Sequence, residues 1–109
     1  MFNNYNIIID SILFDWDNNK NLTNIEKHGI SFVDAVSVFD DEFAILFDDP
    51  DHSTYEERFL IIGYSAIGKI CIVSHCYRNN GNIIRIISAR KATKKEANYY
   101  YKFNRRGYK

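Results

Sequence analysis

One segment near the end of the chain restricts the fold more than any other. Residues 83–90 read Ile-Ile-Arg-Ile-Ile-Ser-Ala-Arg, a nearly continuous β-branched apolar run. This composition is typical of a strand that is buried on both faces and therefore lies inside a sheet. Arg85 and Arg90 are unexpected in such a strand, because an unpaired buried cation is costly. We interpret the strand as one that presents cations to a phosphate backbone.

The residues after this strand start a helix. Thr93 and Glu96 have the spacing of a capping box, in which side chains satisfy backbone amides that the helix leaves open. We predict a helix over about residues 94–104 with an aromatic side. Consecutive residues on a helix point in different directions. We therefore expect Tyr100 to face inward and at least one neighbouring tyrosine to be exposed.

The rest of the chain alternates short apolar strands with two helices. Asp17 and Ser31 have the side chains of helix N-caps, and Gly29 suits the end of the first helix, in which Leu22 and Ile25 should face inward. The predicted elements, in chain order, are a strand at 12–16, helices at 18–28 and 31–39, strands at 43–47, 58–64, 69–77 and 83–89, and a helix at 94–104.

The order β-α-α-β-β-β-β-α predicts an α+β fold with an antiparallel or mixed sheet and helices on one face. The last three strands have short connections, including Asn80-Gly81, so an antiparallel meander is the simplest topology. The length of 109 residues indicates a single domain. We divide the chain into a lead-in at 1–11, which can include a short strand at 7–9, the domain at 12–105, and a basic tail at 106–109.

Composition excludes several classes of protein. An apolar content of 46% is enough for a core, and no apolar stretch approaches the ~18 residues of a membrane helix. The N-terminus lacks the positive region of a signal peptide. Cys71 and Cys76 have no metal-ligand spacing, and we interpret them as small buried hydrophobic residues of a cytoplasmic protein.

The charge is distributed unevenly although its sum is zero. Residues 1–57 carry 2 Lys and 13 Asp or Glu, a net −11, whereas residues 58–109 carry 12 Lys or Arg and one Glu, a net +11. This asymmetry suggests an interaction surface for nucleic acid or for an acidic partner. The alternative is that the acidic half folds onto the basic half and neutralises it.

Several segments together resemble one family. They are Phe14-Asp15-Trp16-Asp17 with Lys20, residues 24–32 (Asn-Ile-Glu-Lys-His-Gly-Ile-Ser-Phe), Asp34-Ala35 with Phe39-Asp40-Asp41, Glu57-Arg58-Phe59 with Ile62-Gly63, and residues 86–93 (Ile-Ile-Ser-Ala-Arg-Lys-Ala-Thr) with Glu96. In this order, over about residues 12–103, they resemble the BrnT family of ribonuclease toxins. An extra lead of about ten residues precedes the family pattern.

The resemblance implies a fold, an activity and a partner. The fold would be RelE-like, and the activity that of an RNA endonuclease that needs no metal ion or other cofactor. The partner would be a BrnA-type antitoxin with a ribbon-helix-helix domain, in a two-plus-two heterotetramer that binds operator DNA through the antitoxin. No membrane is implied.

Metal-free RNA cleavage uses the 2′-hydroxyl as nucleophile, and it needs cations for the phosphorane charge and groups that move protons. Arginine suits the phosphate, because its planar fork bonds two oxygens. We favour Arg58 and Arg90, which lie on the closest family matches. Arg85 and Arg90 are five residues apart, so a regular strand puts them on opposite faces unless a bulge near Ser88 re-aims Arg90. The alternative role for these arginines is to pair with acidic residues of the first half.

Three further cations complete the predicted catalytic set. Lys27 and His28 end the first helix, where the helix dipole favours a cation, and simple capping is the alternative role. Lys20 lies in the first turn, where the dipole disfavours a cation, which makes a functional use attractive. The general base stays open among Lys20, Lys27, His28, Glu57 and His75.

Other polar and aromatic residues have mainly structural interpretations. We expect His75 to be a core histidine bonded to a neighbour, and His52 and the acidic run at 48–51 to be solvated. The histidines lack metal-ligand spacing, so no zinc site is expected. The predicted RNA-binding residues outside the catalytic set are Arg85, Lys91, Lys94, Lys95 and Tyr99, of which Tyr99 would stack on a base.

Two rival functions stay open. The first is a binding module or co-repressor that only docks an antitoxin-like DNA-binding partner, for which Arg58 and Arg90 would matter in complex formation but not in RNA cleavage. The second is a general nucleic-acid binder, which the zero net charge disfavours.

Overall fold

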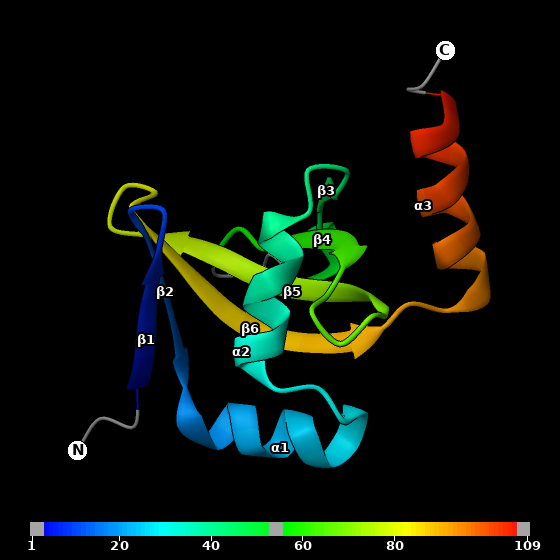
Figure 1. The fold of residues 1–109 in the computed structure, drawn as a ribbon. Helices are drawn as coiled ribbons and strands as arrows, with labels where there is room; N and C mark the ends of the chain where they lie inside the picture. Colours follow the sequence, from blue (N-terminus) through cyan, green and yellow to red (C-terminus); the bar gives the residue numbers. More distant parts are fainter. Residues whose placement is uncertain (1–3, 53–55, 107–109) are drawn as a thin grey trace.

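The computed structural model describes residues 4–52 and 56–106. Within this part of the chain, six strands form one sheet in the order β1-β2-β6-β5-β4-β3 (Figure 1). The strands are β1 (Asn4–Ile9), β2 (Ile12–Asp17), β3 (Ile45–Asp48), β4 (Phe59–Tyr64), β5 (Ile70–Arg78) and β6 (Ile83–Lys91). The helices are α1 (Asn18–His28), α2 (Phe32–Val36) and α3 (Lys94–Arg106), with short 3-10 turns η1 (Ser37–Asp40) and η2 (Pro50–His52).

The α+β class and the mixed sheet are confirmed. Strands β4, β5 and β6 form the predicted antiparallel meander, and β2 pairs with β6 in parallel. The segment 83–91 is central, between β2 and β5, as its composition indicates. The predicted order of elements holds, with one strand added in front.

That added strand lies in the predicted lead-in. Residues 4–9 form β1, which is longer than the short strand expected at 7–9 and pairs with β2 from Asn4↔Asp17 to Ile9↔Ile12. The two-residue turn uses Asp10 and Ser11 with φ of 51° and 69°, a left-handed conformation that suits a tight hairpin. Residues 107–109 of the predicted tail lie outside the described residues.

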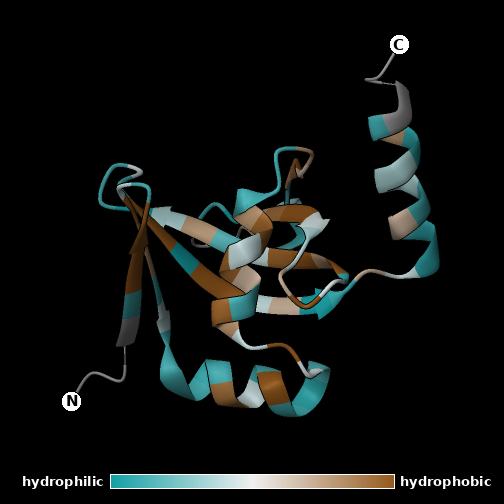
Figure 2. Cartoon of the chain, viewed as in Figure 1, coloured by the Kyte–Doolittle hydropathy of each residue, from teal (hydrophilic) through white to brown (hydrophobic). Residues whose placement is uncertain are grey.

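The face of the sheet under α2 carries the main core, and we call it the closed face. Phe32, Ala35 and Val36 of α2 pack on Val73 of β5 and on other buried residues of the strands. Ser31 caps α2 by accepting from the Asp34 amide at 3.1 Å, as predicted. The hydrophobic residues gather in the strands, whereas α1 and α3 are mostly hydrophilic (Figure 2).

The opposite side of the sheet, which we call the open face, is covered at one end by α3. There Tyr100 and Ala97 pack on Ile62 and Ile72, which alternate along their strands with residues of the closed face. The expectation that all helices share one face is therefore wrong for α3. Its Tyr100 is buried and its neighbours Tyr99 and Tyr101 are exposed, as predicted for the aromatic side.

Helix α1 packs differently from the prediction. Its caps are as expected, with Asp17 accepting from the Asn19 amide at 2.9 Å and Gly29 at φ 71°. However, Leu22 and Ile25 are 57% and 41% exposed, and the buried residue of the helix is Asn24. The prediction that Leu22 and Ile25 face inward is wrong, because a polar side chain makes the contact with the sheet. No helix in the described ranges combines the length and apolar character needed to cross a membrane.

Candidate functional site

A β-bulge in β6 determines which residues reach the open face. Ser74 pairs with Ser88 but His75 pairs with Ile86, so Ile87 is an extra residue on β6. As a result Arg85 and Arg90 lie opposite Cys76 and Ile72, two residues that share one side of the regular strand β5. The bulge near Ser88 that would re-aim Arg90 is thus present. It also leaves Ser88 exposed, so the strand is not buried on both faces as its composition suggests.

The open face holds a hollow of about 490 Å³, which we call the main hollow. Its floor is formed by Leu60, Ile72, Ser74 and Ser88 of the meander. Four cationic or imidazole side chains line it, namely His28 from the end of α1, His52 from η2, Arg58 from the start of β4 and Arg90 from β6. Asp49 and Asp51 add two carboxylates.

A second depression of about 300 Å³, the side hollow, adjoins the main hollow and shares His28, Ile87 and Ser88 with it. Lys20 and Lys27 line the side hollow together with other residues of α1. All five predicted catalytic residues therefore gather in two neighbouring depressions, with Arg58, Arg90 and His28 in the first, Lys20 and Lys27 in the second, and His28 common to both.

Asn24 fixes α1 in the position that makes this possible. Its amide nitrogen donates to the Ala89 carbonyl at 2.8 Å and to the Ile30 carbonyl at 2.9 Å, and its oxygen accepts from the Ala89 amide at 3.0 Å. Strand β2 pairs with β6 only as far as Arg85, and beyond that residue the side chain of Asn24 bonds the free edge of β6. The side chain acts as a short substitute strand, and it holds His28 beside the floor of the main hollow.

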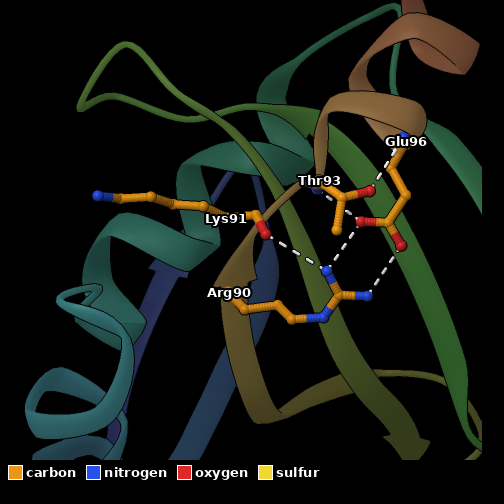
Figure 3. A network of polar contacts seen from close by, with 4 residues as sticks. All are labelled: Arg90, Lys91, Thr93 and Glu96. Carbon is orange, nitrogen blue, oxygen red and sulfur yellow. Dashed lines mark hydrogen bonds and ion pairs between the residues drawn. The ribbon is translucent and has the colours of Figure 1, made fainter.

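Arg90 is held by Glu96 (Figure 3). Its Nη1 and Nη2 donate to the two carboxylate oxygens at 2.8 and 2.9 Å, and Nη1 also approaches the Lys91 carbonyl at 3.3 Å. The hydrogen bonds from Arg90 lower the pKa of Glu96 to about 2. Because Glu96 is the only acidic residue from 58 to 109, the partner of Arg90 does not come from the first half, as the alternative for it required.

The same carboxylate closes the predicted capping box. Glu96 Oε1 accepts from the Thr93 amide at 2.8 Å, and Thr93 Oγ1 accepts from the Glu96 amide at 3.2 Å (Figure 3). The start of α3 therefore fixes one carboxylate, and that carboxylate fixes the direction of the fork of Arg90, a residue that also lines the main hollow.

Sequence reasoning missed a pair at the rim of the main hollow. His52 Nδ1 lies 3.1 Å from both carboxylate oxygens of Asp49. Asp49 is only 8% exposed, so the expectation that the whole acidic run is solvated is wrong for Asp49. The sequence signal is the i,i+3 spacing across Pro50, which starts the turn η2. The Asp49 amide donates to the Arg58 carbonyl at 2.9 Å, which ties this loop to the start of β4.

Arg85 lies outside these depressions. It pairs with Asp15 of β2 at 3.4 Å, so an acidic residue of the first half does engage this arginine. Arg78 pairs with Glu56 at 3.2 Å in a similar way. The two halves of the charge distribution are partly neutralised within the fold.

The other predicted RNA-binding residues are spread over α3 and the end of β6. Lys95 and Tyr99 line an apolar groove of about 540 Å³ with Phe47, and it meets the main hollow at Leu60 and Ile72. The rings of Tyr99 and Phe47 lie 5.8 Å apart. Lys91 and Lys94 line none of these three depressions.

His75 is a core histidine, as predicted. It is completely buried on the closed face, with Nδ1 3.2 Å from the Val73 carbonyl and its ring edge-on to Phe39. Burial lowers its pKa to about 4. His75 therefore does not reach the main hollow, which removes it from the set of general bases. Cys71 and Cys76 are buried thiols, as expected, and burial raises the pKa of each.

The described side chains do not cluster in a way that suits a metal ion. Over residues 4–52 and 56–106, no three His, Cys, Asp or Glu side chains come together in an arrangement that could hold one. The main hollow brings two arginines together with two imidazoles and two carboxylates, a combination that can bind an anion and move protons.

Comparison with known proteins identifies the family of the chain. Residues 16–96 match the family described as "Ribonuclease toxin, BrnT, of type II toxin-antitoxin system". The crystal structure of the Brucella abortus ribonuclease toxin BrnT is similar at a TM-score of 0.55 and 28% identity, over 72% of this chain and 94% of that one. No curated protein gives a significant match.

The chain has a small α+β fold with a cationic hollow on a mixed sheet, and the family match covers most of its length. These features indicate a toxin that cleaves nucleic acid. The chain belongs to the BrnT family of ribonuclease toxins of type II toxin-antitoxin systems.

Proposed function

We propose that this protein is a metal-independent endoribonuclease toxin that cleaves RNA in the main hollow by attack of a 2′-hydroxyl on the adjacent phosphate. The observation that carries the proposal is that Arg58, Arg90 and His28, which come from three distant parts of the chain, line one depression in a member of a ribonuclease family. It acts in the cytoplasm.

The arginines would stabilise charge on the phosphate. Phosphoryl oxygens gain charge as the 2′-oxygen attacks, and fixed guanidinium groups stabilise that charge without reorganising. This role is supported by the presence of both Arg58, just before β4, and Arg90, near the end of β6, in the lining of the main hollow. Glu96 keeps the Arg90 fork aligned. As the phosphate binds, it either displaces the Glu96 carboxylate or shares the guanidinium group of Arg90 with it.

The lysines and His28 would complete the site. Lys20 and Lys27 line the side hollow, where they can bind the next phosphate of the strand. His28 stands between the two hollows and can transfer a proton at the reacting phosphate. Lys95 and Tyr99 in the apolar groove extend this path for RNA, and Lys94 adds a cation at the start of α3. Lys91 pairs opposite Cys71 of the closed face, so it lies off this path. Arg85 contributes from the same face.

An antitoxin would cover the exposed apolar residues. Leu22 and Ile25 on α1 and Val33 on α2 stay exposed, a pattern that often marks a protein interface. The partner we propose is a BrnA-type ribbon-helix-helix antitoxin in a two-plus-two heterotetramer, which contacts operator DNA through the antitoxin.

The test is cleavage of a structured RNA by purified protein in excess EDTA. Arg58→Ala should lower the rate by about 10²–10³-fold, as loss of one preorganised donor does, and Arg90→Ala should have a similar effect. Arg78→Ala, which removes an arginine outside the three depressions, is the matched control and should cleave like the wild type. Discrete products with 2′,3′-cyclic phosphate ends are expected.

Two results would contradict the proposal. Cleavage that disappears with EDTA would show a metal-dependent reaction. Tight binding of a ribbon-helix-helix partner with no cleavage of any RNA would favour the non-catalytic co-repressor, and Arg58→Ala would then weaken only the complex.

A further inference from the structure

We propose that His52, oriented by Asp49, is the group that takes the proton from the attacking 2′-hydroxyl, while His28 gives a proton to the leaving 5′-oxygen. This inference rests on the proposed function and adds the general base that sequence reasoning leaves open. It uses a pair that the sequence presents only as a polar loop.

The contacts of Asp49 determine the state of the imidazole. Its two carboxylate oxygens lie 3.1 Å from Nδ1, so Nδ1 carries the hydrogen and donates it. In the neutral ring Nε2 is then the atom with a free lone pair, which is what a general base needs. The carboxylate also stabilises the imidazolium that forms when Nε2 accepts a proton.

The burial and backbone hydrogen bonds of Asp49 fix the orientation of the His52 ring. The carboxylate side chain is 11% exposed while the imidazole side chain is 66% exposed. The Asp49 amide bonds the Arg58 carbonyl at 2.9 Å, and the His52 amide bonds the Asp49 carbonyl at 3.2 Å. A buried anchor and an accessible ring at the rim of a cationic hollow suit proton transfer to a substrate better than they suit packing.

The other candidates for the base are less suitable. His75 is buried on the closed face, and Glu57 does not line the main hollow. Lys20 and Lys27 lie in the side hollow. His28 ends α1 and lines both hollows, so it lies on the opposite side of the main hollow's lining from the loop of His52 and is assigned the role of proton donor. Asp51 lines the main hollow, but no hydrogen bond from the described residues orients its side chain.

The step balances as an internal phosphoryl transfer. The 2′-O–H bond breaks and its proton moves to His52 Nε2, while the 2′-oxygen forms a bond to phosphorus. The P–O5′ bond breaks, and the 5′-oxygen takes a proton from His28. The products are a 2′,3′-cyclic phosphate and a 5′-hydroxyl, and no metal ion or other reactant is consumed.

The experiment compares two RNA substrates with one cleavable site each, an ordinary one and one whose bridging 5′-oxygen is replaced by sulfur. The thiolate leaves without protonation, so the sulfur substrate needs the base but not the acid. His52→Ala should lose about 10²–10⁴-fold on both substrates. His28→Ala should lose activity on the oxygen substrate and recover most of it on the sulfur substrate.

Two further variants separate chemistry from folding. Added imidazole should partly restore His52→Ala, because it can supply the missing base. Asp49→Asn should lose on the order of 10- to 100-fold, as loss of an orienting carboxylate does, and imidazole should not restore it. Asp48→Asn removes a neighbouring carboxylate that lies outside the main hollow, and it should stay within about fivefold of the wild type.

Each outcome decides between the two proposals. A wild type that cleaves in EDTA, together with a folded His52→Ala that cleaves within fivefold of it, overturns the role of His52 and leaves the proposed function in place. Recovery of His52→Ala on the sulfur substrate makes His52 the acid and overturns its assignment as base. A wild type that cleaves neither substrate overturns both proposals.

Discussion

The two faces of the sheet each carry a histidine, and the contrast between them shows how neighbours decide what an imidazole can do. On the closed face His75 is completely buried among Phe39, Phe59 and Tyr77. On the open face His52 is largely exposed and bonds a buried carboxylate. The first ring is kept neutral by its surroundings and the second is oriented for exchange with solvent or substrate.

The difference extends to the arginines and the carboxylates. The closed face is built from apolar residues that fit together, so its stability comes from burial. The open face is built from side chains held in pairs, such as Arg90 with Glu96 and His52 with Asp49. Pairs in which at least one side chain is exposed add little stability, so we expect their loss to affect RNA cleavage more than folding.

The largest effect that we predict for the closed face is a loss of folding stability in acid. The pKa of His75 falls from 6.5 in the unfolded chain to about 4 in the fold. Below pH 6.5 the unfolded chain binds a proton that the folded state does not, so stability falls with pH until about 4. The loss from this one group is about 3 kcal/mol at most, from 1.4 kcal/mol per pH unit.

Urea unfolding between pH 7.5 and 4 measures this loss. His75→Phe, which keeps an aromatic ring among aromatic neighbours, should flatten the profile over that range. His28→Gln, which removes an exposed histidine instead, should keep the wild-type slope. If the wild type and His75→Phe give parallel profiles, the closed face does not hold His75 neutral.

The closed face could be predicted from the sequence to a large extent. Phe32, Ala35 and Val36 have the spacing of one apolar side of a helix, which is the buried side of α2, and the β-branched run at 83–87 predicted the central strand. Both signals are local patterns of apolar residues. The position of Tyr100 followed in the same way from helical geometry.

The open face could be predicted only in part. The candidates Arg58, Arg90 and His28 came from motifs, but their meeting depends on the bulge at Ile87 and on Asn24, which joins segments 65 residues apart. The pairing of Asp49 with His52 depends on the burial of one carboxylate in an acidic run. The composition of that run does not show which of its carboxylates is buried. Leu22 and Ile25 misled the prediction, because a polar residue docks α1.

Asn24 connects the two faces, and its removal should be the next largest effect. Asn24→Leu leaves the Ala89 amide and carbonyl and the Ile30 carbonyl without their partner in a buried place. The expected cost is about 2–3 kcal/mol of unfolding free energy. Asn24→Asp should not rescue it, because a carboxylate cannot donate to two carbonyls.

Asn19→Leu is the matched control, since Asn19 is an exposed residue of the same helix. It should stay within about 0.5 kcal/mol of the wild type. The open face should also respond, since α1 carries Lys27 and His28, and Asn24→Leu should cleave RNA slowly even at temperatures where it is folded. Full cleavage by folded Asn24→Leu would show that the open face does not need this anchor.

The smallest effect concerns Glu96, and it would test whether a pair on the open face serves alignment more than stability. The pKa of Glu96 is lowered from 4.5 to about 2 by the hydrogen bonds from Arg90. Its contribution is therefore complete above about pH 4.5 and is lost as pH falls toward 2. Because both side chains are accessible to water, we expect Glu96→Gln to cost only about 1 kcal/mol at neutral pH. Gln keeps an oxygen for the Thr93 amide, so the capping box survives and the change isolates the charge.

A double-mutant cycle of Glu96→Gln with Arg90→Gln, followed by urea unfolding at pH 7 and pH 3, gives the coupling between the two side chains. We expect a coupling of roughly 0.5–1 kcal/mol at pH 7 and most of it still present at pH 3, because the carboxyl stays ionised to about pH 2. RNA cleavage by Glu96→Gln should fall more than this small energy accounts for, since a freely rotating Arg90 no longer meets the phosphate in one direction. If cleavage falls only in proportion to the lost stability, the pair of Arg90 and Glu96 does not align Arg90 for the reaction. The two faces would then differ in burial but not in function.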